Sequence, residues 1–255
     1  MRQFWNRNYE SSRAKGLRKT ARSFCGMNSM PNADDAKRLA AQKSLEFISD
    51  GMVVGLGTGS TATHFIRLLG EKVRRGLKIR GISSSKTSQD LAESLSIPMT
   101  DLQHCPEIDV AVDGADEVGP GLALIKGGGG ALLREKIVVS AAKKFIVVAD
   151  ASKVVKRLGK FPLPVEVIPM AAPLVARKLL DLGHASKTRR TKTGAEFITD
   201  EGNLILDCAS CEIEDPEALA AAMRAIVGVV EHGLFLHMAE MALIADGSEV
   251  VTLNK

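Results

Sequence analysis

Short apolar strands and helices alternate through residues 50–150, and the polar or glycine-rich motifs of this stretch come directly after strands. Strands separated by helical crossovers favour a parallel sheet covered by helices. The expected strands lie at 52–56, 78–82, 108–112 and 145–149, and the expected helices at 34–50, 61–75, 88–95 and 131–143. The sequence therefore predicts a Rossmann-like α/β fold with helices on both faces. Ligands are expected at the carboxyl edge of its strands.

The pattern changes at Phe161-Pro162-Leu163-Pro164, where two closely spaced prolines break regular structure. Further strands are expected at 165–168, 196–199, 203–207 and 229–230, and further helices at 171–182 and 216–226. A hairpin turn at 200–203 would join two of these strands, so this part is expected to be a small α+β unit of the ferredoxin-like kind. We therefore expect a Rossmann-like catalytic domain formed by residues 31–160 and 232–255, and a small domain formed by residues 161–231.

The basic character of the chain belongs to its first 30 residues. This segment carries a net charge of +6, so the remaining chain, within a total of +4, carries −2. The body is therefore not expected to bind nucleic acid. Residues 1–30 are expected to be a disordered or non-native leader, although an Arg- and Ser-rich, acid-poor segment is also typical of organelle targeting. Because no apolar run approaches the roughly 18 residues that span a bilayer, a cytoplasmic protein without membrane contact is expected.

Neither a metal nor an organic cofactor is expected. Cys208-x-x-Cys211 with His232 and His237 admits a zinc site, but the gap is too long for a standard finger, and ordinary packing is the simpler role. Gly57-x-Gly59-x-x-Ala62 fits a loose dinucleotide fingerprint. That fingerprint requires an acid at the end of the second strand, where Ser83-Ser84-Ser85-Lys86 stands instead.

A glycine loop between the strand 52–56 and the helix 61–75 is suited to bind phosphate. Free N–H groups at a helix start attract anions, glycines let the backbone come close, and hydroxyls add donors. The alternative is a strand–helix turn that is rich in glycine for steric reasons alone. The expected phosphate contacts are Thr58, Gly59, Ser60 and Thr61.

Two more motifs follow strands or extended pieces. Asp113-Gly114-Ala115-Asp116-Glu117 offers carboxylates for sugar hydroxyls or proton exchange, although the aspartates could only cap a turn. Lys126-Gly127-Gly128-Gly129-Gly130 places a cation beside backbone N–H groups, which suits a developing oxyanion. Glu135 between Arg134 and Lys136 would ordinarily be a solvated helix residue, but it follows this loop directly. Together these groups suit proton transfer next to a carbonyl, with a carboxylate as the base.

These motifs, in this order, resemble those of the ribose-5-phosphate isomerase A family over about residues 34–255. The matching motifs lie at 57–61, 113–117, 126–129, 134–136, 149–153 and 161–169. The resemblance implies interconversion of D-ribose 5-phosphate and D-ribulose 5-phosphate through an enediolate, in the non-oxidative pentose phosphate pathway. It also implies that no metal takes part and that the chain forms a homodimer or a larger homo-oligomer.

The resemblance further assigns roles to single residues. Glu135 is the implied proton acceptor, Asp113 the helper in opening the sugar ring and Lys126 the stabiliser of the enediolate, with Asp116 also in the catalytic group. The implied substrate contacts are Thr58, Gly59, Ser60, Thr61, Asp113, Gly114, Ala115, Asp116, Lys126, Gly127, Gly128, Gly129 and Lys153.

The sequence departs from the family pattern at two places. Gly130 stands where alanine is expected, which should loosen the helix start slightly, and Lys86 stands where a small or acidic residue is expected and should point to solvent. The main alternative function is a non-catalytic sugar-phosphate-sensing domain of a transcriptional regulator. Such regulators normally carry a DNA-binding helix-turn-helix, which residues 1–30 do not resemble. Amino-sugar-phosphate deaminases and coenzyme A transferases are weaker alternatives on related folds.

Overall fold

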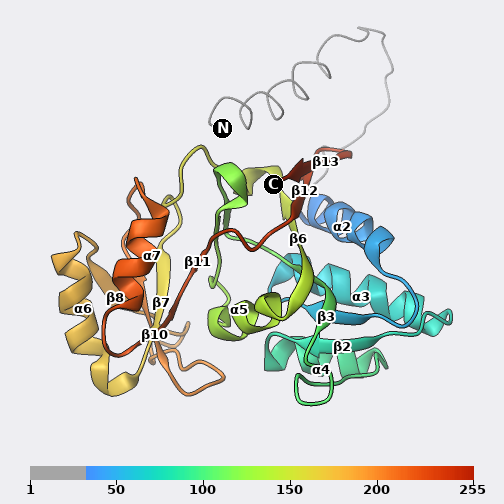
Figure 1. The fold of residues 1–255 in the computed structure, drawn as a ribbon, viewed down its shortest axis with the longest axis horizontal. Coiled ribbons are helices and arrows are strands. Elements are labelled where there is room, and N and C mark those ends of the chain that lie inside the picture. Colours follow the sequence, from blue (N-terminus) through green and yellow to red (C-terminus); the bar gives the residue numbers. More distant parts are fainter. Residues whose placement is uncertain (1–32) are drawn as a thin grey trace, which may run out of the picture.

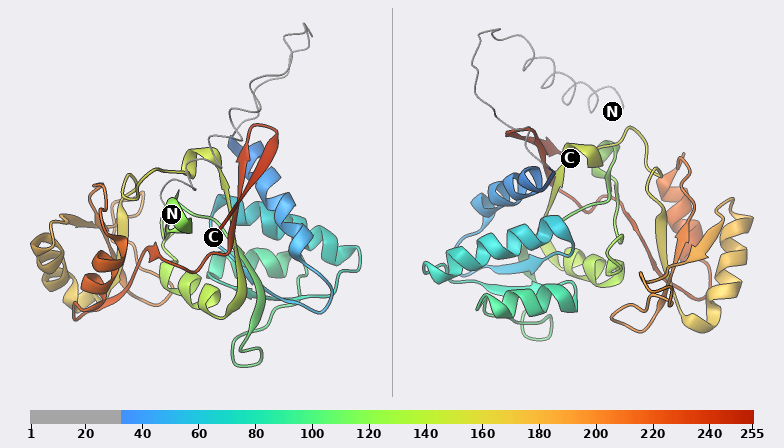
Figure 2. Two further views of the ribbon diagram at one scale, coloured as in Figure 1. Left: turned by 45° about the horizontal axis from the view of Figure 1, so that its top comes forward. Right: turned by 180° about the vertical axis from the view of Figure 1, so that it is seen from behind.

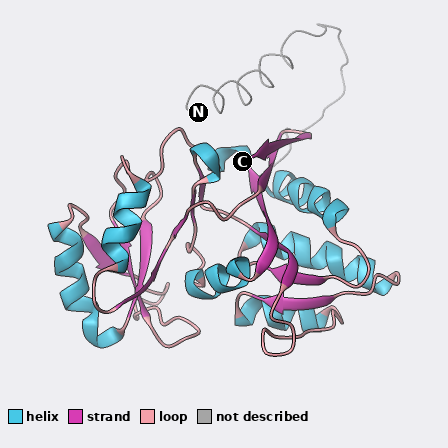
Figure 3. Ribbon diagram, viewed as in Figure 1, coloured by secondary structure: helices cyan, strands magenta, loops and turns pink. Residues whose placement is uncertain are grey.

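The computed structural model describes residues 33–255, so the predicted leader lies outside the described residues. The described chain forms sheets of six, four and three strands. Figure 1 shows the two larger sheets in separate halves of the molecule, each with its own helices. Figure 3 shows the same arrangement by type of structure, with strands magenta and helices cyan.

The six-stranded sheet has the order β13-β12-β6-β3-β1-β2. All neighbouring strands are parallel except the last pair at the C-terminal edge, β12 and β13. The strands are β1 (Val53–Leu56), β2 (Arg80–Ser83), β3 (Ile108–Asp113), β6 (Ala142–Asp150), β12 (Met241–Asp246) and β13 (Glu249–Asn254). The helices beside them are α2 (Ala33–Ser44), α3 (Ser60–Arg74), α4 (Lys86–Ser94) and α5 (Leu132–Ser140). The predicted Rossmann-like sheet and the return of the tail to it are confirmed.

Both faces of this sheet are covered. Phe65 and Leu69 of α3 pack with residues of α2 and with Val54 on one face. Val138 and Val139 of α5 pack on the other. Alternate residues of the buried strands therefore serve two separate hydrophobic clusters, as expected for parallel strands with helices on each side. Helix α5 is shorter than predicted, because the chain is already extended at Ala142, where it pairs with Ile108.

The strand order places a topological switch point between β1 and β3. The chain leaves β1 toward the β2 edge, and from β3 it proceeds toward β6, on the opposite side. The loops after β1 and β3 therefore diverge and leave a crevice at the carboxyl edge of the sheet, where ligands of such folds bind.

The four-stranded sheet is antiparallel and has the order β10-β7-β9-β8. Its elements, in chain order, are β7 (Leu163–Val167), α6 (Ala172–Asp181), β8 (Ser186–Thr188), β9 (Leu204–Cys208), α7 (Pro216–Arg224) and β10 (Val229–His232). This βαββαβ order is the ferredoxin-like arrangement that the sequence predicts. Val175, Leu179 and Met223 of the two helices form a core with the sheet.

One predicted strand of this unit is wrong. Residues 196–199 make only isolated bridges, Glu196 to Arg190 and Ile198 to Leu204. The second strand is instead β8, which pairs with β9. Ile198 is 53% exposed and Thr199 is the one buried residue of this segment, so no alternating buried face fixes residues 196–199 in a sheet.

A small sheet joins the two halves. It consists of β4 (Glu117–Val118), β5 (Leu124–Ile125) and β11 (Leu234–Phe235), in the order β11-β5-β4. After β10 the chain pairs with β5 through β11 and then enters the large sheet as β12, a path that Figure 2 shows from two further directions. The exact limits of the two domains stay a prediction. Among residues 33–255, no helix is long and apolar enough to cross a membrane.

Candidate active site

Three loops at the carboxyl edge of the strands enclose a pocket of about 120 Å³. They follow β1, β3 and β5, and the start of α5 adds a fourth side. The pocket is lined by Thr58, Gly59, Ser60, Thr61, Gly114, Ala115, Asp116, Lys126, Gly127, Gly128, Gly129, Glu135, Lys153 and Lys37. Of the residues predicted from the sequence, only Asp113 does not line it.

Lys126 occupies the centre of the site. It follows β5, and its side chain is 2% exposed. Its Nζ lies 3.0 Å from Asp113 Oδ2 and 3.5 Å from Glu135 Oε1, and it donates a hydrogen bond of 2.6 Å to the carbonyl of Gly114. Burial disfavours the charged amine, but Asp113 and Glu135 outweigh it and raise the pKa of Lys126. The lysine is therefore a fixed cation.

Asp113 lies behind this lysine, at the end of β3. Its Oδ1 accepts hydrogen bonds from the backbone N–H groups of Thr58 (2.9 Å) and Gly114 (2.7 Å). Burial raises the pKa of Asp113, while Lys126 and these N–H groups act in the opposite direction. The approach to the β1 loop requires glycine at position 57, because a Cβ there would lie 2.1 Å from Asp113 Oδ1.

Glu135 enters the pocket from the first turn of α5 and is only 3% exposed. Burial raises its pKa to about 8; the charges of Asp113 and Asp116 add to this effect and Lys126 opposes it. Its Oε2 atom is buried and accepts no hydrogen bond from any described residue. A carboxylate with a free oxygen and a pKa near neutrality is suited to accept and return a proton.

The loop after β1 leads into α3, whose first-turn N–H groups have no acceptors within the helix. Thr58 is held by hydroxyls of the loop after β2: its Oγ1 lies 2.9 Å from Ser84 Oγ and 2.8 Å from Ser85 Oγ. Ser88 Oγ donates to the carbonyl of Gly57 at 2.7 Å. The β1 loop is thus fixed from outside, and the N–H groups of the first turn of α3 are left for an anion.

Two further lysines line the pocket. Lys153, after β6, was predicted from the resemblance. Lys37, on α2, was not predicted. Sequence reasoning missed Lys37 because it lies on an ordinary amphipathic helix, and only the packing of α2 against α3 brings it to the β1 loop. Both are suited to balance the charge of a phosphate.

The two departures from the family pattern have different outcomes. Lys86 is exposed and does not line the pocket, so its predicted orientation is confirmed. Gly130 has a φ of +84°, and a Cβ there would lie 2.3 Å from Cζ of Phe197. The glycine is therefore required by its backbone conformation and by the ring beside it, and does more than loosen the helix.

Glu117 and the cysteine motif lie outside the site. Glu117 is buried and accepts hydrogen bonds from the backbone N–H groups of Gly159 and Phe161, so it ties β4 to the start of the small unit. Cys208 is buried and Cys211 is exposed. Within residues 33–255, no three His, Cys, Asp or Glu side chains come together as a metal site would need.

Comparison with known proteins gives one consistent result. A sequence model of the family "Ribose 5-phosphate isomerase A (phosphoriboisomerase A)" matches residues 80–249. Ribose-5-phosphate isomerase A of Parvibaculum lavamentivorans is 51% identical over 228 residues, covering 86% of this chain and 99% of that protein. The enzyme of Caulobacter vibrioides is 48% identical and covers 88% of this chain and 99% of its own length.

Solved structures with a similar fold belong to the same family of proteins. Ribose 5-phosphate isomerase A from Methanocaldococcus jannaschii superposes with a TM-score of 0.84 at 42% identity, covering 88% of this chain and all of that one. A D-ribose-5-phosphate isomerase in complex with phospho-erythronic acid gives a TM-score of 0.85 at 41% identity, with coverage of 88% and 100%. The chain belongs to the ribose-5-phosphate isomerase A family.

Proposed function

We propose that this chain interconverts D-ribose 5-phosphate and D-ribulose 5-phosphate, with Glu135 as the base that moves the proton. The observation that carries this proposal is the buried Glu135, which lines the same pocket as Lys126 and whose Oε2 accepts no hydrogen bond from the described residues. A second carboxylate is placed beside the same lysine. This arrangement fits proton transfer next to a carbonyl better than nucleotide or metal chemistry.

In the proposed reaction, Glu135 removes the proton from C2 of the open-chain aldose. The electron pair forms the C1–C2 double bond, and the C1 oxygen becomes an oxyanion. The ammonium group of Lys126 stabilises that charge inside a buried site, where electrostatic interactions are strong. Glu135 then gives its proton to C1, the C2 hydroxyl proton passes to the C1 oxygen, and the C2 carbonyl forms. Atoms and charge balance without any other reactant.

The phosphate is expected at the β1 loop. The first turn of α3 supplies N–H groups, Thr58, Ser60 and Thr61 supply hydroxyls, and Lys37 and Lys153 supply charge. The relative solved with phospho-erythronic acid supports this class of ligand. In that acid the carboxylate stands in for the two enediolate oxygens and the phosphate for that of the substrate.

The two aspartates are proposed to act differently. Asp116 lines the pocket, where its carboxylate can bind sugar hydroxyls. Asp113 lies behind Lys126 and fixes the lysine and the β1 loop. Its role in ring opening stays a prediction. A cytoplasmic location and a homo-oligomeric state are likewise proposed on family membership alone.

The decisive experiment measures ketose formation from ribose 5-phosphate in the presence of EDTA. We expect turnover by the wild-type chain and a loss of about 10²–10⁴-fold in Glu135→Gln, which keeps the shape of the side chain but cannot accept the proton. Glu71→Gln, on the exposed face of α3, is the matched control and should be unchanged.

Three outcomes would count against the proposal. An inactive wild-type chain that still binds ribose 5-phosphate would favour the sugar-phosphate-sensing alternative. Loss of turnover with EDTA that returns on adding metal would contradict the metal-free reaction. Full activity of Glu135→Gln would remove Glu135 as the base.

A further inference from the structure

The loop of residues 126–130 lacks any side chain after Lys126 that could hold it in place. Glycine loses more conformational freedom on ordering than other residues, so such a loop needs anchors from elsewhere. Within the loop, the N–H of Gly130 donates to the carbonyl of Gly127 at 3.0 Å. This single bond does not fix the direction of the peptide groups at the pocket.

The anchor comes from the small ferredoxin-like unit. Arg189, directly after β8, donates from Nη1 to the carbonyls of Gly127 (2.8 Å) and Gly128 (3.1 Å). The other nitrogens of the same guanidinium, Nε and Nη2, donate to the two carboxylate oxygens of Asp207 at 2.9 and 2.5 Å. Arg189 is only 13% exposed, so this two-sided contact is largely shielded from water. Planar, forked hydrogen bonding of this kind is specific to arginine.

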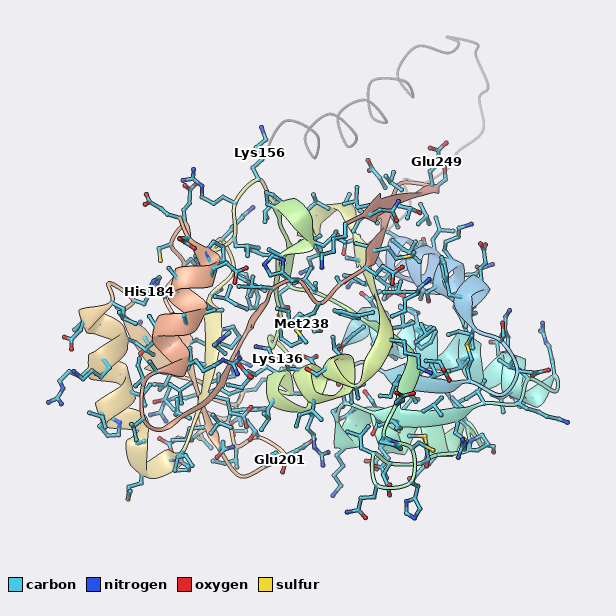
Figure 4. The ribbon with its side chains drawn as sticks, viewed as in Figure 1. Lys136, Lys156, His184, Glu201, Met238 and Glu249 are labelled. Carbon is cyan, nitrogen blue, oxygen red and sulfur yellow. The ribbon has the colours of Figure 1, made fainter. Side chains whose placement is uncertain are left out.

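The rest of the segment 189–201 also contacts the catalytic half. The ring of Phe197 lies against Gly130, with the Arg189 guanidinium 6.0 Å from the ring centroid. At the turn of the segment, Glu201 accepts a hydrogen bond of 2.6 Å from Nε of Arg134, on α5 next to Glu135. Figure 4 shows Glu201 at the lower end of the molecule, between its two halves. The segment thus contacts both the glycine loop and the helix that carries the proposed base.

The contacts of Arg189 determine where two N–H groups of the loop point. In a trans peptide the C=O and N–H groups point in opposite directions. With the Gly127 carbonyl held by Arg189, the N–H of the same peptide, from Gly128, donates to Asp116 Oδ2 at 2.7 Å. With the Gly128 carbonyl held, the N–H of Gly129 points away from Arg189. Gly129 lines the pocket, and its N–H donates to no acceptor among the described residues.

We propose that Arg189, held by Asp207, is a positioning residue that aims the Gly129 N–H at the enediolate and fixes Asp116 through the Gly128 N–H. This inference rests on the proposed isomerase function. Arg189 does not line the pocket, so no direct contact with the substrate is expected. Arg189 is therefore expected to affect stabilisation of the enediolate, whose oxyanion accepts from the Gly129 N–H. It should affect binding of the substrate phosphate less.

The test compares Arg189→Met with Arg190→Met. Arg190 is the matched control, because it is exposed and, among residues 33–255, its guanidinium donates only to the carbonyl of Gly194 in its own turn. In Arg189→Met we expect kcat to fall about 10²-fold, the loss typical of a misplaced reacting geometry, with little change in KM. Binding of phospho-erythronic acid, measured by calorimetry, should weaken more than binding of ribose 5-phosphate. Arg190→Met should match the wild type in all three measurements.

Arg189→Lys keeps the charge but cannot form the forked hydrogen bonds. Its kcat is therefore expected to lie between that of the wild type and that of Arg189→Met. If Arg189→Met melts below the assay temperature, Arg189→Lys and Asp207→Asn, which loosens the guanidinium, replace it in the same comparison. Equal kcat in Arg189→Met and Arg190→Met, or a change in KM alone, overturns the inference. The calorimetric comparison does not depend on turnover, so an inactive wild type would refute the proposed function without deciding the role of Arg189.

Discussion

Two buried lysines lie close to one aromatic ring. The Nζ atoms of Lys126 and Lys136 lie 5.5 and 4.7 Å from the centroid of Phe235, close enough for both to be attracted by the ring. Lys126 belongs to the pocket, and Lys136 lies between α5 and the strands β10 and β11, where Figure 4 labels it. The same residue type is thus used twice within a short distance, in two different surroundings.

The two sites differ in how many hydrogen-bonding atoms of the lysine and of its carboxylate partners are paired. Lys136 donates to Glu231 (2.9 Å) and to the carbonyls of His232 (2.7 Å) and Leu234 (2.9 Å), which accounts for all three of its protons. Glu231 in turn accepts from Arg224 at 3.0 Å. Around Lys126, by contrast, Glu135 Oε2 accepts no hydrogen bond from the described residues, and Asp113 Oδ2 has only its ion pair of 3.0 Å with Lys126 there.

The charges differ in the same way. Two carboxylates outweigh burial at Lys126 and raise its pKa, whereas burial outweighs the one shared carboxylate at Lys136 and lowers its pKa to about 8. The Lys136 group therefore joins α5 to β10 and β11 and leaves no carboxylate available to accept a proton. The Lys126 group keeps an excess of acid, and this excess leaves Glu135 able to bind a proton.

The largest contrast is expected from Lys126→Met. The change removes the cation opposite the enediolate, which should lower kcat by about 10³-fold. It also leaves two buried carboxylates without their partner, so the free energy of unfolding should fall by about 3–5 kcal/mol. Steady-state kinetics and urea denaturation measure the two effects. A variant with lower stability but wild-type kcat would mean that Lys126 only supports the fold, as Lys136 does.

The pH dependence of kcat/KM is the next largest effect. Burial raises the pKa of Glu135 to about 8, and only the ionised carboxylate can accept the substrate proton. Activity should therefore rise about tenfold for each pH unit below about 8 and level off above it. Rates measured across this range at constant ionic strength test the expectation. A profile that stays flat through neutral pH would mean that Glu135 is already ionised there and that Lys126 outweighs burial.

Much of this site could be predicted from the sequence because its loops are local. Glycines and acids directly after strands need no knowledge of packing, and parallel strands bring all their carboxyl ends to one edge. The Rossmann-like sheet and the pocket position of Glu135 follow from such signals. The small unit was predicted from its order of apolar segments and turns, although its second strand is β8 and not the predicted 196–199. The burial of Glu135 does not, since its neighbours Arg134 and Lys136 are typical of a solvated helix.

The parts that could not be predicted depend on contacts between distant segments. Lys37 reaches the pocket through helix packing, and Arg189 reaches the glycine loop from the other half of the chain. Phe197 lies in a segment that was expected to be a strand, although its ring packs on Gly130. The position of Phe235 near two lysines has no local signal either. Side chains of this kind are recognisable only once the tertiary fold is known.

The smallest effect on activity is expected from Lys136→Met. Removing this lysine frees the carbonyls of His232 and Leu234 from a buried donor and leaves Glu231 with Arg224 as its remaining cation. Because Arg224 still balances the acid, the free energy of unfolding should fall by about 3 kcal/mol, the lower end for a broken buried pair. The kcat of the folded protein should change only a few-fold, since the pocket keeps Lys126, Glu135 and the three loops. Urea denaturation and kinetics well below the melting temperature test this. A loss of kcat as large as that of Lys126→Met would show that the two lysines form one unit through Phe235, and that the division between a reactive and a structural lysine is wrong.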